Sequence, residues 1–248
     1  MNNFSIATIL LSIIMPTIVS ADCIDPPAPR VNWDGCNKEK QDFQKIDLRE
    51  AVLKNTNFND TNLTKSRLAN ADLGSAILNN ANLEGVKAKK ARFVGASLKK
   101  TSINNARLTH TSFDRANLSQ SRINKSDFSN SSFYNATLTE ANLSQSNFSK
   151  SNFEQANMAQ VNASGAIFHQ AILSESYMSD ANLQNADFSR AKLDNSDLSG
   201  ADFSNANLQG ADLHNADINN AIFTNAILDN ATWVNRKRCR PGSVGVCK

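Results

Sequence analysis

Four cysteines near the two ends of the chain are the residues whose type and spacing most directly indicate chemistry. Cys23 and Cys36 have twelve residues between them, and Cys239 and Cys247 have seven. An even number of cysteines favours disulfides in an oxidising compartment, and neither spacing matches the CxxC pairs of zinc or redox sites. Three pairings are open on paper; the placement as two close pairs favours the two local disulfides.

Basic residues gather in the first half of the chain. Residues 86–125 contain ten lysines and arginines against one acid, Asp114, although the formal net charge of the whole chain is only +3. Such a surface can bind an anionic surface, a glycan or a protein partner, or it can be a solvated face that keeps the chain soluble. No aromatic residue is interleaved at an outward position, which disfavours nucleic acid as the ligand. The candidate binding residues, which we call the basic belt, are Arg67, Lys87, Lys89, Lys90, Arg92, Lys99, Lys100 and Arg107.

The sequence offers no defined catalytic or metal-binding set. His110, His169 and His214 are scattered, and Ser, Asn and Asp are so frequent that any Ser/His/Asp triple chosen from them is arbitrary. Catalysis also needs a concave pocket that excludes water and orders the reacting groups. We therefore expect no enzyme activity, no metal site and no cofactor.

A five-residue period must position all of these side chains. The 39 positions at intervals of five from Phe43 to Trp233 hold 19 Leu, 12 Phe, 3 Ile, 2 Met, 2 Ala and 1 Trp. The position two places before each of them is Ala, Ser or Thr in most repeats, and the position just before it favours Asn and Asp, as in Ala71-Asp72-Leu73. The frame does not slip between the two ends, so one repeating unit accounts for most of the chain.

Neither regular secondary structure explains this period. In an α-helix, five residues turn the chain by about 500°, which would spread the large residues around the helix. In a flat strand, an odd spacing sends alternate large residues to opposite faces. A coil that turns a corner every five residues keeps both the large residue and the small residue inside. The period therefore predicts a solenoid in which each coil extends the core of the previous one.

Two repeats depart from the rule at the central place. Ala88 and Ala163 stand where a large residue is expected, and in the same repeats the small place holds Val86 and Val161. We interpret this exchange as volume compensation within a packed core. A dent or bend for a ligand is the alternative.

The tandem A(D/N)LXX units, such as Ala181-Asn182-Leu183, resemble the signature of the pentapeptide repeat family over about four-fifths of the chain. The resemblance implies an all-β fold, a right-handed quadrilateral β-helix with four pentapeptides per coil. The repeats would then form about ten coils and a rod on the order of 45 Å long. The cysteine-containing flanks are similar to those of exported bacterial members of the family.

With twenty residues per coil, an outward column is expected to contain Asp47, Arg67, Lys87, Arg107 and Asp127. Its three successive bases repel one another, an effect that the terminal aspartates and salt partly offset.

The ends of the chain complete the predicted organisation. Residues 1–21 carry no charged side chain and end in Val19-Ser20-Ala21, which is typical of a secretory signal peptide; an uncleaved N-terminal anchor is the alternative. Residues 22–40 are then an N-terminal cap, residues 41–235 the β-helix and residues 236–248 a basic C-terminal cap. No stable membrane span is expected after cleavage.

Three functions are compatible with these features. The first is an exported, non-enzymatic scaffold or binding module in the bacterial periplasm or outside the cell. The second is a secreted effector or a topoisomerase-binding inhibitor, because the family that the chain resembles includes inhibitors of DNA topoisomerases that act as acidic mimics of DNA. The basic middle of the rod opposes this second function. The third is a polyanion-binding protein that uses the basic belt. The sequence names no partner and leaves the oligomeric state open.

Overall fold

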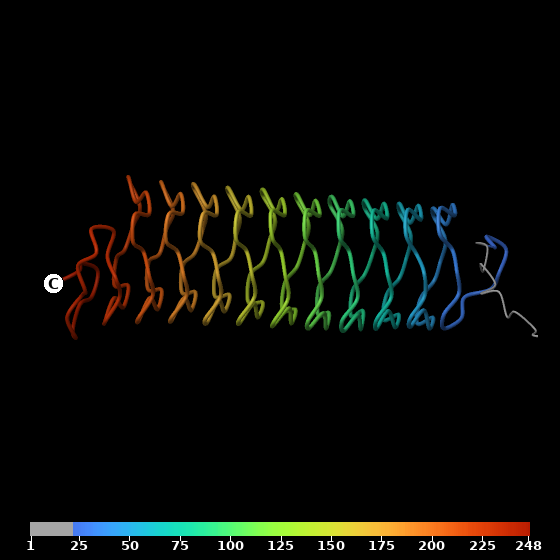
Figure 1. Cartoon of the computed structure of the whole chain (residues 1–248), viewed down its shortest axis with the longest axis horizontal. Helices are drawn as coiled ribbons and strands as arrows, with labels where there is room; N and C mark the ends of the chain where they lie inside the picture. Colours follow the sequence, from blue (N-terminus) through green and yellow to red (C-terminus); the bar gives the residue numbers. More distant parts are fainter. Residues whose placement is uncertain (1–21) are drawn as a thin grey trace, which may run out of the picture.

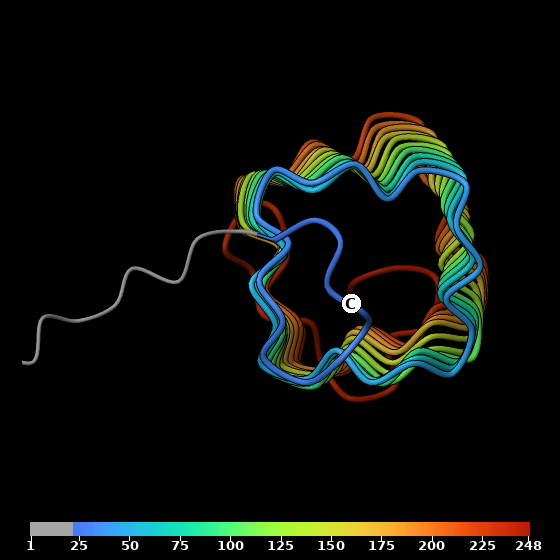
Figure 2. The same ribbon diagram turned by 90° about the vertical axis from the view of Figure 1, so that its right-hand side faces the viewer.

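The protein is a straight rod built from stacked coils of backbone (Figure 1). The computed structural model describes residues 22–248, and the predicted signal peptide, residues 1–21, lies outside the described residues. Viewed along the rod, the coils superimpose closely around one common interior (Figure 2). The solenoid expected from the five-residue period is therefore the architecture of the chain.

The coils are joined by isolated parallel β-bridges between residues twenty apart. The first bridge of the series is Asn32↔Val52 and the last is Asp212↔Thr232. Each bridged residue is the one that precedes a central residue, and residues 22–248 contain no helix and no extended strand. Because twenty residues are four five-residue units, equivalent places of successive coils lie directly above one another.

The last residue of each unit turns the corner between two sides. It has a positive φ, as in Asn55 (54°), Lys65 (58°) and Asn105 (56°). Asn is frequent at this place because it tolerates the left-handed conformation better than most other side chains. The N–H of the same residue donates to the next coil, as from Asn55 to the Gly74 carbonyl at 3.0 Å. The corner residue thus turns the chain from one side to the next and also joins two coils.

The preference for Asn and Asp before the central residue has a local cause. The side-chain oxygen of Asn82 accepts a hydrogen bond from the backbone N–H of Glu84 at 3.0 Å, and Asn142 makes the same bond with Ser144 at 3.1 Å. Such bonds to the backbone two residues on stabilise tight turns. The outward residue therefore pairs with the next coil through its backbone and with the following corner through its side chain.

The central residues form the core. Phenylalanines twenty apart stack face to face, with 4.7 Å between the ring centroids of Phe93 and Phe113, 5.1 Å between Phe113 and Phe133, and 4.5 Å between Phe133 and Phe153. Each of these rings is completely buried. Aromatic stacking of this kind adds about 0.5–1.5 kcal/mol per pair to the burial of the rings.

Most buried Ser and Thr residues at the small inward place donate to a backbone carbonyl of the coil below; Thr111, Ser176 and Ser196 donate to the carbonyl three residues earlier, and the Ser121 hydroxyl has no partner among the described residues. The Thr101 hydroxyl donates to the Leu78 carbonyl at 2.8 Å, and Ser151 donates to the Phe128 carbonyl at 2.8 Å. A buried hydroxyl without a partner would be destabilising. Ser and Thr can therefore replace Ala at this place when they reach a backbone carbonyl.

The two repeats that have alanine at the central place remain buried at both inward places. Val86 and Ala88 are fully buried, and so are Val161 and Ala163 to within 1% of their surface. This burial agrees with the exchange of volume between the two inward places.

The repeat geometry extends into the segment expected to be the N-terminal cap. Trp33 and Lys38 occupy central places of the first coil, and the Trp33 ring stacks on Phe43 with 5.3 Å between centroids. The Lys38 ammonium lies 3.9 Å from the centre of the Trp33 ring and donates to the Cys23 carbonyl at 2.7 Å. Burial lowers the pKa of Lys38, while the carboxylates of Asp25 and Asp22 act in the opposite direction. The lysine stem thus covers the end of the core, and its ammonium is solvated by the segment that the Cys23–Cys36 disulfide closes.

The chain reverses after Trp233 to form the C-terminal cap. Antiparallel bridges join Thr232 to Arg238 and Ile227 to Val244, and a disulfide joins Cys239 to Cys247. Both disulfides are the local ones favoured by the sequence. The cap covers only part of the last coil, since Ile218 and Phe223 remain partly exposed.

Replacing Leu143 with Asp should destabilise the rod by more than about 4 kcal/mol, because it places an unpaired carboxylate in the core. Leu143 is completely buried. Ser144→Asp, on the outward neighbour, is the matched control and should change stability by less than about 0.5 kcal/mol. Thermal unfolding followed by circular dichroism measures both, and equal melting temperatures for the two variants would contradict the inward register.

Candidate functional site

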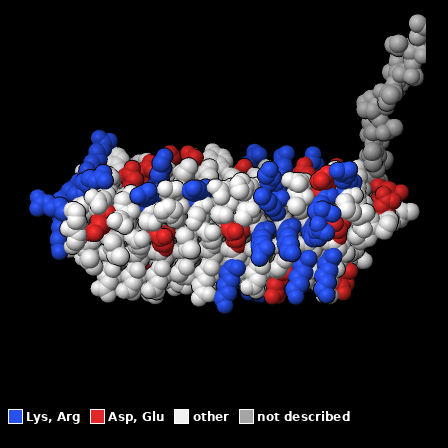
Figure 3. Space-filling model, turned by 90° about the horizontal axis from the view of Figure 1, so that it is seen from below, with Lys and Arg blue, Asp and Glu red and all other residues white. Residues whose placement is uncertain are grey.

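The basic belt lies on the surface of the half of the rod nearer the N-terminus. All eight of its side chains are exposed. Figure 3 shows lysines and arginines stacked over successive coils in this half, a second group of bases at the C-terminal end, and fewer charges between the two. The charge variation along the sequence thus becomes a variation along the axis.

One column of the belt forms as expected from the twenty-residue coil. Bridges join Asp47 to Arg67, Arg67 to Lys87, Lys87 to Arg107 and Arg107 to Asp127. Neighbouring strands in a sheet lie about 4.8 Å apart, so the backbones of three bases follow one another at that spacing. The column therefore concentrates positive charge along a line parallel to the rod axis.

Only the first base of this column is neutralised by a carboxylate. The Arg67 guanidinium lies 3.3 Å from Asp47, which also binds Arg49 at 2.7 Å. Hydrogen bonds from Arg49, supported by the charge of Arg67, hold the pKa of Asp47 below its usual value. Asp47 is therefore ionised at neutral pH and offsets the charge at this end of the column.

The remaining seven belt residues make no ion pair with any residue in the described part of the chain. This includes Arg107, although Asp127 follows it in the column. Exposed like charges repel weakly in water, and salt screens the repulsion over about 8–10 Å. The arrangement contributes little to the stability of the rod and leaves the bases available to an external anion.

A shallow hollow of about 370 Å³ interrupts the surface beside the column. Its lining residues are Lys65, Glu84, Gly85, Lys87, Asn105 and Arg107. Gly85 stands at the corner place between Lys65 in the coil below and Asn105 in the coil above, with a φ of +66°. Because this corner has no side chain, three bases border one open volume. The hollow is not evident from the sequence, because Gly95 and Gly165 also occupy corner places and do not line it.

The belt is not a single patch. Lys89 and Lys90 follow Lys87 along the same side of the coil, but Lys99 and Lys100 lie about half a turn further around the rod, given the twenty-residue coil. An extended ligand on the side that carries Lys87 would therefore contact part of the belt, and the other lysines would act through the general field of the rod.

The histidines remain apart from one another in the structure. His169 and Ser189 share a hydrogen bond of 2.7 Å, and His214 accepts one of 2.7 Å from Arg236. Residues 22–248 contain no group of three or more His, Cys, Asp or Glu that could hold a metal ion. No helix within the same residues is long and apolar enough to cross a membrane.

Comparison with known families gives a match over most of the rod. The family model for pentapeptide repeats matches in eight overlapping copies between residues 42 and 232. A comparison with curated proteins finds no significant match.

Three solved structures illustrate the likeness. HetL, a pentapeptide repeat protein involved in heterocyst differentiation regulation in the cyanobacterium Nostoc, is 24% identical, with 85% of this chain and 92% of that chain covered and a TM-score of 0.40. A trypsin-treated form of QnrB1, a plasmid-mediated fluoroquinolone resistance protein, is 20% identical, with 66% and 90% covered and a TM-score of 0.43. A pentapeptide repeat protein from the Arabidopsis thaliana thylakoid lumen is 26% identical, with 44% and 66% covered and a TM-score of 0.17.

Replacing Lys87 with Gln should stabilise the free protein at low ionic strength, because it removes the middle charge of the column. We expect the melting temperature to rise by about 1–3 °C and the gain to vanish in 1 M salt. Lys125→Gln is the matched control, since Asn105 and Gln145 precede and follow Lys125 in its own column. A gain that persists in 1 M salt, or that appears equally in the control, would show that repulsion in the column is not its cause.

Proposed function

The chain belongs to the pentapeptide repeat family, whose fold is a right-handed β-helix, and on that premise we propose that it is a non-enzymatic binding rod. Its proposed location is an oxidising compartment outside the bacterial cytoplasm, either the periplasm or the exterior of the cell. Its proposed ligand is an anionic surface, such as an acidic glycan or anionic lipid, that contacts the basic belt.

The observation that carries the proposal is the set of exposed belt bases without carboxylate partners. Arg107 and Lys87 remain unpaired although acidic residues are available elsewhere on the rod. Repulsion within the column gives no benefit to the free protein, whereas a polyanion would neutralise it and release counterions. Such binding should therefore depend strongly on salt.

The shape of the rod supports a binding role rather than catalysis. We propose a quadrilateral β-helix of about ten coils, consistent with bridges between residues twenty apart. Most side chains on its outside are polar and in contact with water, and isolated apolar residues such as Ile77 and Tyr177 are exposed among them. Acid–base catalysis depends on groups whose pKa values are tuned by burial and neighbouring charges, and a convex surface of this kind provides little desolvation.

Two features support export. The Cys23–Cys36 and Cys239–Cys247 disulfides require an oxidising environment to persist. The apolar residues 1–21 have the composition expected of a cleaved signal peptide. Export would separate the protein from cytoplasmic DNA-binding enzymes, and the basic column lacks the acidic character that a mimic of DNA needs.

A full-length protein with a C-terminal tag should be recovered from the periplasm or the culture medium of a bacterial host, and its N-terminus should be Asp22. Cell fractionation followed by N-terminal sequencing measures both. Replacing Ala21 with a bulky residue such as Phe should block cleavage and is the control for processing. An uncleaved protein that remains in the cytoplasm would refute export and favour the topoisomerase-inhibitor alternative.

Removal of five belt charges should weaken binding to an anionic surface by about tenfold or more, because each exposed contact contributes up to about 1 kcal/mol. The variant replaces Lys87, Lys89, Lys90, Arg92 and Arg107 with Gln. Retention on immobilised heparin and sedimentation with phosphatidylglycerol vesicles, each over a range of salt concentrations, separate the glycan from the lipid.

The control variant removes the same number of charges outside the belt by replacing Lys45, Arg115, Lys125, Lys150 and Lys192 with Gln. It should retain most of the binding if the belt is the site. Equal losses in the two variants would show that only net charge matters, and the absence of binding to either anion would refute a polyanion ligand.

A further inference from the structure

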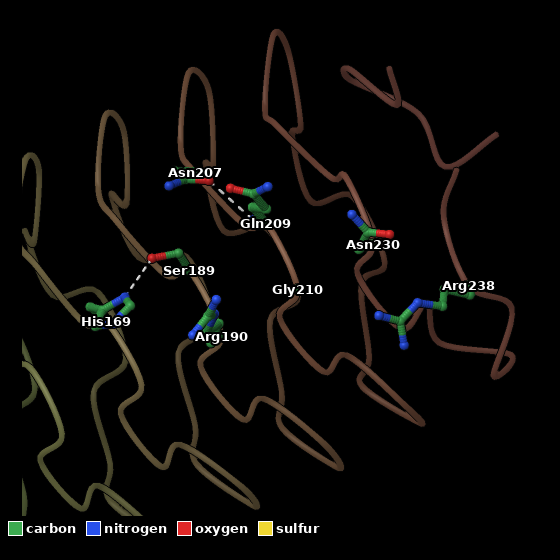
Figure 4. A pocket seen from close by; sticks show the side chains of 8 residues that line it. All are labelled: His169, Ser189, Arg190, Asn207, Gln209, Gly210, Asn230 and Arg238. Atoms are coloured by element: carbon green, nitrogen blue, oxygen red, sulfur yellow. Dashed lines mark hydrogen bonds between the residues drawn. The ribbon is translucent and has the colours of Figure 1, made fainter. Parts of the chain in front are cut away.

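A second and larger hollow lies on the half of the rod nearer the C-terminus, away from the basic belt. Its volume is about 590 Å³, which is within the range of small-molecule sites. We call it the C-terminal hollow, and its lining residues, drawn in Figure 4, are His169, Ser189, Arg190, Asn207, Gln209, Gly210, Asn230 and Arg238. None of them is an aliphatic residue or a Phe, Tyr or Trp, so polar and charged side chains line most of the hollow.

A corner glycine lines this hollow, as Gly85 lines the hollow beside the belt. Gly210 has a φ of +67° and stands between Arg190 in the coil below and Asn230 in the coil above. A Cβ at this place would lie 3.6 Å from Cγ of Arg190, which is an ordinary contact. The neighbouring structure would therefore accept a side chain, and its absence leaves the space between Arg190 and Asn230 open.

The C-terminal cap supplies the second arginine. Arg238 pairs with Thr232 in an antiparallel bridge, and the next residue, Cys239, donates to the Ala231 carbonyl at 2.9 Å and forms the disulfide with Cys247. Figure 4 shows Arg190 and Arg238 on either side of Gly210, with Asn230 next to Arg238. Two guanidinium groups from distant parts of the sequence thus border one open volume.

Neither guanidinium has a partner within residues 22–248. No ion pair and no side-chain hydrogen bond is formed by Arg190 or Arg238. A nearby carboxylate, Asp229, instead accepts hydrogen bonds from the backbone N–H groups of Gly242 at 2.8 Å and Ser243 at 3.0 Å. The Asp229 carboxylate therefore binds the backbone of the C-terminal cap, and Arg190 and Arg238 remain available to a ligand.

Uncharged polar groups surround the two bases. The side-chain amides of Gln209 and Asn230 form no hydrogen bond with the described chain, while the Asn207 amide donates to Asp187 at 3.1 Å. Free amides can both donate to and accept from hydroxyl groups, and guanidinium groups bind oxyanions through paired hydrogen bonds. A molecule that is complementary to the amides and to the guanidinium groups carries hydroxyls and an anionic group.

We propose that the C-terminal hollow binds an acidic sugar. One of the two guanidinium groups, which stand on either side of Gly210, holds its carboxylate or sulfate group, and the other, with the amides of Gln209 and Asn230, contacts its hydroxyls. This site is independent of the basic belt, because it shares no residue with the belt and its ligand is a discrete sugar unit rather than an extended polyanion. The Cys239–Cys247 disulfide positions Arg238, so binding also depends on the oxidised state of the cap.

A titration of the oxidised protein with sodium glucuronate, followed by backbone amide NMR, tests the site. We expect saturable shifts at Gly210, Asn230 and Arg238 and no such shifts with glucose. Arg190→Gln and Arg238→Gln should each raise the dissociation constant by about fivefold or more, because each removes one charged contact. Gly210→Asn should abolish binding by filling the hollow, since Asn occupies the equivalent corner place at Asn195 and Asn205 with φ values of 58° and 59°.

Arg115→Gln is the matched control, because Arg115 is also an exposed corner residue without an ion pair but lies outside the hollow. It should leave the dissociation constant unchanged, and thermal unfolding should show that all variants remain folded. Reduction of the disulfides should weaken binding in the same titration. The proposal is overturned if glucuronate produces no shifts at the hollow, if Gly210→Asn binds as tightly as the original chain, or if sodium sulfate alone binds as tightly as glucuronate.

Discussion

The hydrogen-bonded contact between residues twenty apart is the constraint on which the rest of the structure depends. Along most of the rod, the N–H groups of the corner residues and of the outward residues donate to a neighbouring coil, so successive units must turn through the same angle in the same number of residues. A single inserted residue would move every later Leu and Phe out of the core, which explains why the frame does not slip. The small inward residue and the left-handed corner residue are both consequences of this requirement.

The same constraint determines what the surface can do. Each outward side chain has a neighbour directly above and below it, so charges that would be dispersed on a globular protein form columns on the rod. The pairing of Arg67 with Asp47 and the unpaired state of Lys87, which stands between two bases, result from which residues stand twenty apart. The identity of the outward residues does not affect packing in the core, so the outer surface of such a rod can vary without loss of the fold.

The sequence predicts the repetitive part of this protein well, because one period describes both the core and the stacking. The column from Asp47 to Asp127 and the exchange between Val86 and Ala88 follow directly from it. The ends are harder to predict, since no repeated contact determines them. Lys38 occupies a central place that elsewhere holds apolar residues, and it is tolerated because its ammonium reaches the Cys23 carbonyl in the segment that precedes the first coil. Periodicity alone does not reveal that contact.

The hollows show how a site can arise in a structure that repetition makes uniform. A base, a glycine and an asparagine follow one another at intervals of twenty residues in Lys65, Gly85 and Asn105, and again in Arg190, Gly210 and Asn230. In both cases the corner lacks a side chain and the backbone is undisturbed, because the corner already has the conformation that glycine adopts readily. The cap then adds Arg238 to only one of the two hollows. A regular solenoid thus acquires local specificity by omitting side chains along its length and by adding a non-repetitive segment at its end.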